Sequence, residues 1–473
     1  RGMRREHERR MRTRARARLA SGVAVGASLA LAGSARADVF TVNSTADPGT
    51  GTCDTSECTL REAVNAANVT TDADTINFSL PAGPQTINLN ASQLAVTQSL
   101  TVDGTGEDLL TIDAGPGAGY NDTSRVFNVQ GSSGAGVSFD LSDLTLSGGI
   151  AGASGGQARN GGAILSSLAN LAIRRVTMSG NLATADGGAL YFSGGSANPS
   201  SQGQLLLDDV TVSGNTSFAG AAGVSASNGF VDIADTEISG NDAVPSTAFS
   251  SPKYSGGGGL TIISYDFVVA DTTITGNSAA GRSTGPGKYA LSGGGGAILT
   301  GGGSIEDSTV TDNQAQTSGG GLSVSNGATV ERTTVSGNSL SSFTGRGGGV
   351  HLEDADLIDS SVTGNDAANG GGVAAPEGEN RIDGSTIAAN TAAVGGGLRL
   401  SESARVTLRS STISGNSASS GNGGGVYAND YDPPRLTIRS SILGNNQPNN
   451  TDLDSDSPSR AATAAHIRAV RTA

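Results

Sequence analysis

Four aspartates recur at the same place in successive repeats of the sequence, at Asp209, Asp235, Asp271 and Asp307. Each stands six residues before an asparagine. If the repeats stack, these carboxylates form a row about 5 Å apart, which is repulsive unless water, hydrogen bonds or a cation relieves it. One interpretation is that each Asp caps its own turn; the other is that Ca²⁺ binds between repeats. The chain lacks the Gly-Gly-x-Gly-x-Asp repeat of calcium β-rolls, and no metal site or other cofactor is assigned.

The two lysines of the chain, Lys253 and Lys288, are each followed by a tyrosine, at Tyr254 and Tyr289. Both pairs lie in insertions just before a glycine run. Together with Tyr265 they form a candidate ligand-binding patch, where rings stack on sugars and ammonium groups meet uronate or sulfate. The alternative is that the two Lys-Tyr pairs occur by coincidence in solvated loops.

Acid pairs suitable for glycoside hydrolysis are present but not distinctive. Hydrolysis needs two carboxylates about 5–10 Å apart. Such acids are present at Asp208 and Asp209 and at Glu353, Asp354 and Asp356, but the repeats are acidic throughout. The Gly-His-Gly signature of polygalacturonases is absent, and His351 stands in an apparent strand. We interpret His351 as a residue of a coil face, and no catalytic residue is assigned.

The elements that position these residues come from a repeat of the type Thr-x-Ser-Gly-Asn followed by a glycine run. Its asparagine recurs at intervals of 25 to 36 residues, a period typical of solenoids. The asparagines are Asn181, Asn215, Asn241, Asn277, Asn313, Asn338, Asn365, Asn390, Asn416 and Asn445. Three residues before them stand Met178, Val212, Ile238, Ile274, Val310, Val335, Val362, Ile387, Ile413 and Ile442.

A second apolar column lies eight residues before nine of the ten asparagines. The two columns are five residues apart, an odd number, so a straight strand would place them on opposite faces. A bend must therefore separate two short strands, and a third strand follows the glycine run. Three β-branched strands per repeat predict an all-β fold, a parallel β-helix of about 13 coils. The general crossover rule makes it right-handed. A leucine-rich repeat is the alternative, but it requires Leu-dominated strands.

The N-terminal residues 1–37 have the features of a secretory signal. An arginine-rich start precedes a short apolar run, and Ala35-Arg36-Ala37 fits a cleavage site. Residues 1–37 hold ten of the 29 Lys and Arg and two of the 43 Asp and Glu, so the mature chain has a net charge of −22. Such a surface disfavours nucleic acid. No later run is long enough to span a membrane.

Residues 38–73 are predicted to cap the solenoid. Cys53 and Cys58 predict a small-loop disulfide in an exported chain, with a metal pair as the weaker alternative. Thr59 and Glu62 form a capping-box pattern, and the apolar spacing that follows predicts a helix over about 60–68. Because the open end of a β-helix exposes core and strand edges, a helical lid is expected here.

The segment Cys58-Thr-Leu-Arg-Glu-Ala63, with Asp74-Thr-Ile-Asn-Phe78 and Leu100-Thr-Val-Asp-Gly104, resembles the family of exported bacterial β-helix proteins with a Cys-Ser-Leu-Arg-Glu-Ala motif. Thr59 stands where that motif has Ser. The Gly-Gly-Ala-Ile segments at 161–164 and 295–298 resemble repeats of polymorphic outer-membrane, adhesin-like proteins. These resemblances imply a right-handed β-helix and export, and they do not imply one particular activity.

The predicted organisation is a signal at 1–37, a cap at 38–73, a β-helix at 74–445 and an unassigned or disordered tail at 446–473. The function predicted is that of a secreted or cell-surface, adhesin-like protein without catalysis, which binds polysaccharide or surface glycans through its flank loops. The alternative is a carbohydrate-active enzyme, a polysaccharide lyase or glycoside hydrolase, on the same fold.

Overall fold

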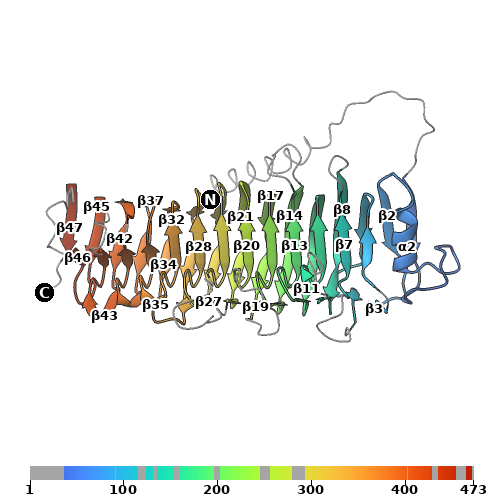
Figure 1. Ribbon diagram of the computed structural model, residues 1–473, viewed down its shortest axis with the longest axis horizontal. Coiled ribbons are helices and arrows are strands. Elements are labelled where there is room, and N and C mark those ends of the chain that lie inside the picture. Colours follow the sequence, from blue (N-terminus) through green and yellow to red (C-terminus); the bar gives the residue numbers. More distant parts are fainter. Residues whose placement is uncertain are drawn as a thin grey trace, which may run out of the picture. The chain divides into compact units, whose positions relative to one another are not determined.

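The computed structural model shows a parallel β-helix, as predicted (Figure 1). The chain from Ala37 onward forms one compact unit. In it, three sheets have 24, 13 and 10 strands, which we name sheets A, B and C. The structure describes residues 37–90, 92–115, 124–131, 136–152, 159–195, 203–244, 256–279, 293–401, 403–428, 435–453 and 465–470.

Sheet B contributes one strand to each coil, directly after the glycine run. Its strands are β4 (Leu94–Val96), β7 (Phe127–Gln130), β10 (Ile164–Ser167), β13 (Leu190–Ser193), β16 (Val224–Ser227), β20 (Leu260–Ile263), β24 (Ala297–Thr300), β28 (Leu322–Ser325), β32 (Val350–Glu353), β36 (Val373–Ala375), β40 (Leu398–Leu400), β44 (Val426–Ala428) and β46 (Thr451–Leu453).

Sheet A contains the two strand segments around the predicted bend. Before the bend lie β1 (Val39–Val42), β2 (Asp74–Phe78), β5 (Leu100–Asp103), β17 (Phe230–Ala234), β21 (Asp266–Ala270), β25 (Ser304–Glu306), β29 (Thr329–Glu331), β33 (Asp356–Ile358), β37 (Glu379–Asp383) and β41 (Arg405–Arg409). After it lie β3 (Gln85–Asn88), β6 (Leu110–Asp113), β18 (Glu237–Ser239), β22 (Thr273–Thr275), β26 (Thr309–Thr311), β30 (Thr334–Ser336), β34 (Ser361–Thr363), β38 (Thr386–Ala388) and β42 (Thr412–Ser414). Four strands run through the bend, namely β8 (Val137–Ser147), β11 (Ala169–Ser179), β14 (Gln204–Ser213) and β45 (Arg435–Gly444), and β47 (Ala465–Val470) pairs with β45.

Sheet C is a set of short strands that follow the asparagines, and the sequence pattern did not predict it. They are β9 (Ile150–Ala151), β12 (Leu182–Ala183), β15 (Thr216–Ser217), β19 (Asp242–Ala243), β23 (Ser278–Ala279), β27 (Gln314–Ala315), β31 (Ser339–Leu340), β35 (Asp366–Asn369), β39 (Thr391–Val394) and β43 (Ser417–Asn422). Most have only two residues, which is too short for a hydrophobic alternation to be visible.

The bend in sheet A is a single residue in the left-handed conformation. From Asp143 to Ser440, the bend residues have φ between +46° and +61°. Aspartate tolerates this conformation better than most residues because its short side chain bonds locally. They are Asp143, Arg175, Asp209, Asp235, Asp271, Asp307, Arg332, Asp359, Gly384, Ser410 and Ser440. The left-handed backbone conformation of the bend therefore explains why aspartate recurs at this position.

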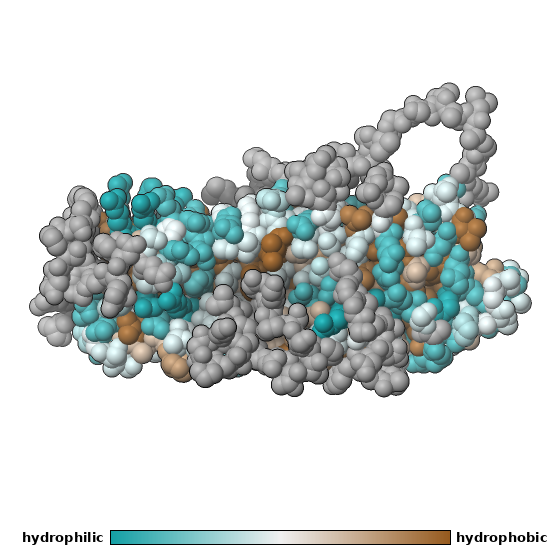
Figure 2. Space-filling model, viewed as in Figure 1, coloured by the Kyte–Doolittle hydropathy of each residue, from teal (hydrophilic) through white to brown (hydrophobic). Residues whose placement is uncertain are grey.

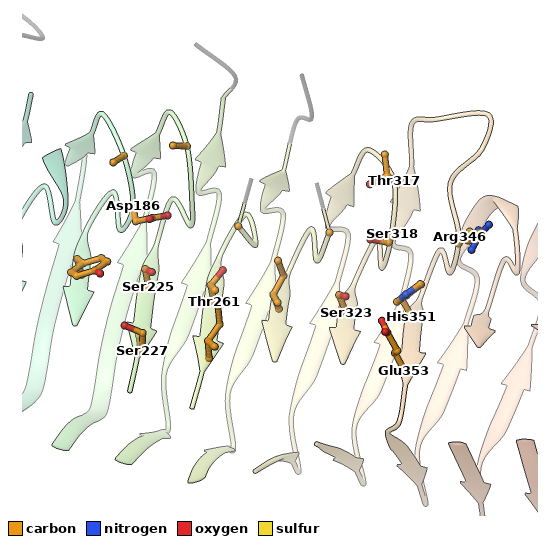
Figure 3. Close-up of a pocket in the computed structure, with 18 of the residues that line it drawn as sticks. Asp186, Ser225, Ser227, Thr261, Thr317, Ser318, Ser323, Arg346, His351 and Glu353 are labelled. Atoms are coloured by element: carbon orange, nitrogen blue, oxygen red, sulfur yellow. The ribbon is translucent and has the colours of Figure 1, made fainter. Parts of the chain in front are cut away.

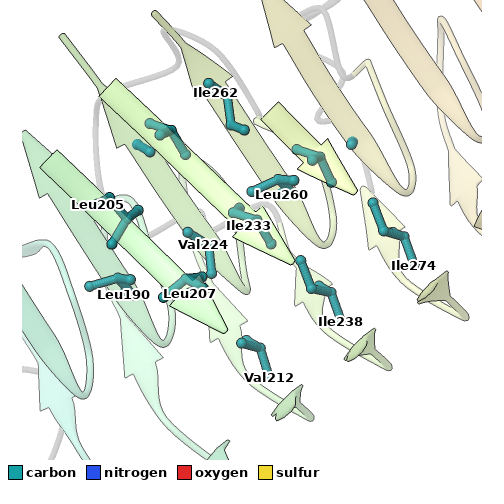
Figure 4. Close-up of a cluster of buried hydrophobic side chains, with 14 of the residues drawn as sticks. Leu190, Leu205, Leu207, Val212, Val224, Ile233, Ile238, Leu260, Ile262 and Ile274 are labelled. Atoms are coloured by element: carbon teal, nitrogen blue, oxygen red, sulfur yellow. The ribbon is translucent and has the colours of Figure 1, made fainter. Parts of the chain in front are cut away.

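Inside the coils, the predicted apolar columns form a continuous core (Figure 4). Leu205 and Leu207 before the bend and Val212 after it all point inward, and the same holds for Ile233 and Ile238 in the next coil. Their exposure is 0 or 1 %. Burying each such side chain contributes about 1.5–3 kcal/mol, so the stacked coils are stabilised mainly by these columns.

The asparagine column forms a buried hydrogen-bonded ladder. Asn338 Oδ1 accepts from the backbone N–H of Asn313 at 2.9 Å and from its Nδ2 at 3.0 Å. Asn338 Nδ2 donates to the Val310 carbonyl at 3.0 Å and to Asn365 Oδ1 at 3.0 Å. The same pattern joins the asparagines from Asn181 to Asn416. The asparagine column therefore has a structural role, because its side chains join one coil to the next inside the β-helix.

A second polar ladder, which the sequence interpretation missed, lies directly after the bend. The backbone N–H of Thr333 donates to Ser360 Oγ, and that of Ser360 donates to Ser385 Oγ, both at 3.1 Å. Each hydroxyl in turn donates to the carbonyl two residues earlier, as Ser360 Oγ does to Ile358 at 2.7 Å. The sequence feature that would have predicted this ladder is the Ser or Thr that stands five residues before the asparagine.

The N-terminal end is covered as predicted. Helix α2 (Leu60–Ala67) starts with the capping box, in which Thr59 accepts from the Glu62 N–H and the Glu62 carboxylate accepts from the Thr59 N–H. Leu60 and Val64 are buried in the same core as the strands. Cys53 and Cys58 form a disulfide beside this helix.

The last coil is displaced by one residue from its predicted register. Ile413 pairs with Leu443 rather than with Ile442, and Ile442 is 44 % exposed. Asn446, not Asn445, accepts from Asn416. The repeats also continue past residue 445, where the β-helix was predicted to end, since β46 pairs with β44 and β47 with β45.

Candidate functional site

A groove of about 960 Å³ runs along the outer face of sheet B (Figure 3). Strands β13, β16, β20, β24, β28 and β32 contribute its floor, and the residues after β36 end it. Neighbouring parallel strands lie about 4.8 Å apart, so these seven coils give a length of about 29 Å. The groove is therefore long enough for an extended polymer.

The floor is formed by one outward-facing column of sheet B. On each strand the core fixes the inward positions, such as Leu190 and Val224. The alternate positions point to the outer face of the sheet, where neighbouring segments leave Ser225 and Thr261 only 7 and 8 % exposed. In register along the groove, the column consists of Tyr191, Ser225, Thr261, Ile298, Ser323 and His351. Its middle is uncharged and contains mostly hydroxyl groups, which can both donate and accept hydrogen bonds.

Tyr191 marks one end of the groove, together with Arg159 and Asp186. Asp186 is placed by its backbone N–H, which donates to Asn160 Oδ1 at 3.2 Å. Its carboxylate occupies the space that a Cβ of Gly220 would need, with only 1.1 Å between Oδ1 and that position. Burial raises the pKa of Asp186. A glycine is thus required at position 220, because any side chain there would displace the Asp186 carboxyl group.

Four ionisable residues form the other end of the groove: Arg346, His351, Glu353 and Glu377. His351 and Glu353 are two residues apart on β32, so both face outward, as Figure 3 shows. Burial, and then the charge of Arg346, lower the pKa of His351 to about 4, although a backbone hydrogen bond with Arg346 acts in the opposite direction. His351 is therefore neutral at pH 7. Its Nδ1 is buried and makes no hydrogen bond with described residues.

Of the candidate ligand-binding residues predicted from sequence, only Tyr265 lies in a described region. Its side chain is 69 % exposed in the turn after β20. Lys253, Tyr254, Lys288 and Tyr289 lie outside the described residues. Ile263, two residues before Tyr265, lines the groove.

The candidate calcium row occupies the bend of sheet A, away from the groove strands. Asp209, Asp235, Asp271 and Asp307 succeed one another there, and Arg175 and Arg332 flank the row. Arg332 pairs with Asp307 through two contacts of 2.9 Å. No group of three or more His, Cys, Asp or Glu side chains in the described part of the chain is arranged to hold a metal.

The sequence interpretation did not identify the groove, although it named two of its residues. His351 was interpreted as a coil-face residue, and it does face outward, but on the groove floor beside Glu353. The groove floor could have been recognised from the alternation after each glycine run, because every second residue of a strand whose other residues are buried must face outward. No helix within the described residues has the length and apolar character needed to cross a membrane.

Comparison with known proteins agrees with the fold. The family model described as "Right handed beta helix region" matches residues 321–457, in accord with the predicted handedness. No curated protein sequence matches the chain.

Solved structures that resemble the chain include two carbohydrate-active enzymes. The A-module of the mannuronan C-5 epimerase AlgE6 of Azotobacter vinelandii has 15 % identity and a TM-score of 0.40, over 81 % of this chain and 93 % of that one. The catalytic domain of a GH87 α-1,3-glucanase has 10 % identity and a TM-score of 0.38, over 95 % and 70 %. At these values the likeness carries no argument about this chain, and the fold rests on its own strands and on the family model. By fold, this chain is a right-handed parallel β-helix protein.

Proposed function

We propose that the protein is exported and binds an extended glycan along the sheet B groove, without cleaving it. The observation that carries this proposal is the groove floor, where six side chains follow one another at intervals of about 4.8 Å. A linear polymer placed along the coil axis meets one new side chain at every coil.

The chemistry of the floor suits sugars. Ser225, Thr261 and Ser323 offer hydroxyl groups, while Tyr191 offers an aromatic face with a polar tip. The groove ends carry both signs of charge, in contrast to the acidic chain as a whole, whose net charge is −14. Binding through many weak polar contacts fits a surface protein that holds a polymer.

Export is supported by the leader-like residues 1–37 and by the Cys53–Cys58 disulfide, since disulfides persist mainly in oxidising compartments. The motif at Cys58–Ala63 and the glycine-rich repeats add a resemblance to exported and adhesin-like β-helix proteins.

The positions of the acids favour binding over hydrolysis. Asp186, whose pKa is raised, and Glu353 lie five coils apart, which is about 24 Å along the axis. That exceeds the 5–10 Å over which two carboxylates cooperate on one glycosidic bond. The protonatable acid and the second acid therefore cannot act together.

A carbohydrate-active enzyme is the second candidate, and one observation favours it. Glu353 and Glu377 lie on neighbouring coils at the same end of the groove, beside the neutral His351. Two carboxylates on adjacent coils can reach one glycosidic bond. Cleavage must therefore be measured together with binding.

The test is a polysaccharide array read for both retention and release of new chain ends. We expect retention without release, and we expect Tyr191→Ala to weaken it about tenfold, equivalent to about 1.4 kcal/mol. The matched control is Tyr427→Ala, because Tyr427 lies on the same outward column of sheet B beyond the groove. Equal affinity of the two variants would exclude the groove, and release abolished by Glu353→Gln would establish the enzyme instead.

A further inference from the structure

The outer face of sheet A after the bend carries two parallel ranks of hydroxyl groups. In nine successive coils, the residues on either side of the buried apolar residue face outward, and eight of nine in each rank are Ser or Thr. The first rank is Thr177, Thr211, Glu237, Thr273, Thr309, Thr334, Ser361, Thr386 and Thr412. The second rank is Ser179, Ser213, Ser239, Thr275, Thr311, Ser336, Thr363, Ala388 and Ser414.

The ranks are in register through every coil. Thr273, Thr309 and Thr334 are consecutive pairing partners, as are Thr275, Thr311 and Ser336. The pairing continues one-for-one to β42 without a bulge. Successive coils are about 4.8 Å apart and the two ranks about 6.7 Å apart, so the hydroxyl groups form a two-dimensional lattice about 38 Å long.

Strand propensity alone does not explain this face. Threonine suits any half-exposed strand position, so the equivalent outward positions before the bend, in the same nine coils, serve as a comparison. Nine of those eighteen are charged: Arg174, Asp208, Asp232, Glu306, Glu331, Asp356, Arg381, Asp383 and Arg409. After the bend, Glu237 is the one charged residue among eighteen.

The side chains of this face are also held in place. The residues between the two ranks, such as Ile274, Val310 and Val335, are fully buried, which fixes the orientation of both neighbours. β-branched Thr has few χ1 rotamers in a strand. Thr311 Oγ1 lies 3.1 Å from Thr275 Oγ1, which links adjacent coils. The face is thus rigid before any ligand arrives.

We propose that this face, the hydroxyl lattice, binds the surface of ice. Ice presents water oxygens at fixed positions, with a repeat of the same order as the spacing between coils. A single Thr–water contact gains little over liquid water, but a rigid array forms many contacts at once without an entropic penalty for each. Neutral groups are required, because charged side chains retain their own strongly bound water.

The composition of the lattice favours ice over a crystalline polysaccharide. Sugar rings are commonly held by stacking on aromatic side chains, and none of the eighteen lattice positions is aromatic. The lattice positions are instead Ser or Thr at sixteen of the eighteen places, and Thr311 Oγ1 lies 3.1 Å from Thr275 Oγ1 in the adjacent coil. This proposal is independent of glycan binding, which uses the groove of sheet B.

The experiment measures incorporation of the full chain into slowly growing ice and the shape of single ice crystals. We expect wild-type protein to enter the ice and facet the crystals. The double variant Thr309→Lys/Thr334→Lys should be excluded, like a non-binding reference protein. The matched control is Thr329→Lys/Thr407→Lys, which makes the same changes on the charged face before the bend.

All three proteins should melt at similar temperatures, because each Thr→Lys change is on a solvated strand face. Exclusion of the wild-type protein from ice overturns the proposal. Equal loss in both folded double variants overturns the assignment to this face. Retention on microcrystalline cellulose or chitin that depends on Thr309 and Thr334, without ice binding, would make the lattice a polysaccharide site instead.

Discussion

Acidification should destabilise the protein through His351. Burial and the charge of Arg346 lower the pKa of His351 from 6.5 to about 4, so the folded state disfavours the imidazolium. Above pH 6.5 His351 is neutral in both the folded and the unfolded state, so the protein keeps its full stability there. Stability is then lost as pH falls from 6.5 towards 4. A difference of two and a half units corresponds to about 3 kcal/mol, of which about 2.5 kcal/mol is lost by pH 4.5.

Chemical unfolding at pH 7.5 and pH 4.5 measures this loss. The control is His351→Gln, which retains a polar side chain but cannot titrate, so carboxylates that protonate at low pH cancel between the two proteins. We expect the wild type to lose about 2.5 kcal/mol more than the variant. An imidazole signal that titrates near pH 6.5, or equal losses in both proteins, would refute the placement of His351 at the buried end of the groove.

Two further predictions concern the ladder and the insertions. Asn338→Ala removes the acceptor for two Asn313 donors and the donor to the Val310 carbonyl, so it should cost about 3–5 kcal/mol of unfolding free energy in urea titration. Asn422→Ala, at an exposed strand residue, should cost less than about 0.5 kcal/mol, and similar costs would contradict the ladder. If the Lys-Tyr insertions form a glycan patch, Tyr254→Ala with Tyr289→Ala should abolish retention on a glycan array; unchanged retention rejects the patch.

The interior of the coils could be predicted because packing dictates it. The odd spacing between the apolar columns required a bend, and the bend is the left-handed residue at positions such as Asp235. Where two residues satisfied the same pattern, the prediction failed. Asn445 and Asn446 both fit the ladder, but Asn445 takes the left-handed place held by Gly415 one coil earlier, at φ +57°. Asparagine tolerates that conformation, so the sequence left the register open.

The groove was not predictable in the same way, because no packing rule constrains outward positions. Serine at 225 or 323 is equally compatible with a solvated face and with a groove floor. These serines form a groove floor because a wall stands beside them. The wall includes Thr317, Thr344 and Arg346, and it comes from the segments of variable length that connect sheet C to sheet B. Because these segments differ in length from coil to coil, they have no counterpart in the repeat pattern.

The outward surfaces of sheet A, before and after the bend, and of sheet B therefore carry independent information, although a single repeat builds all three. The face before the bend is charged and irregular, as expected of a surface selected for solubility. The face after the bend has Glu237 as the one charged residue among eighteen positions over nine coils, and the groove on sheet B has ionisable groups at its ends. Because the core does not constrain the outward residues, core packing alone explains neither the uniformity of one face nor the residues that line the groove. The two ligands proposed above, an ice surface on the hydroxyl lattice and a single polymer chain in the groove, would account for both.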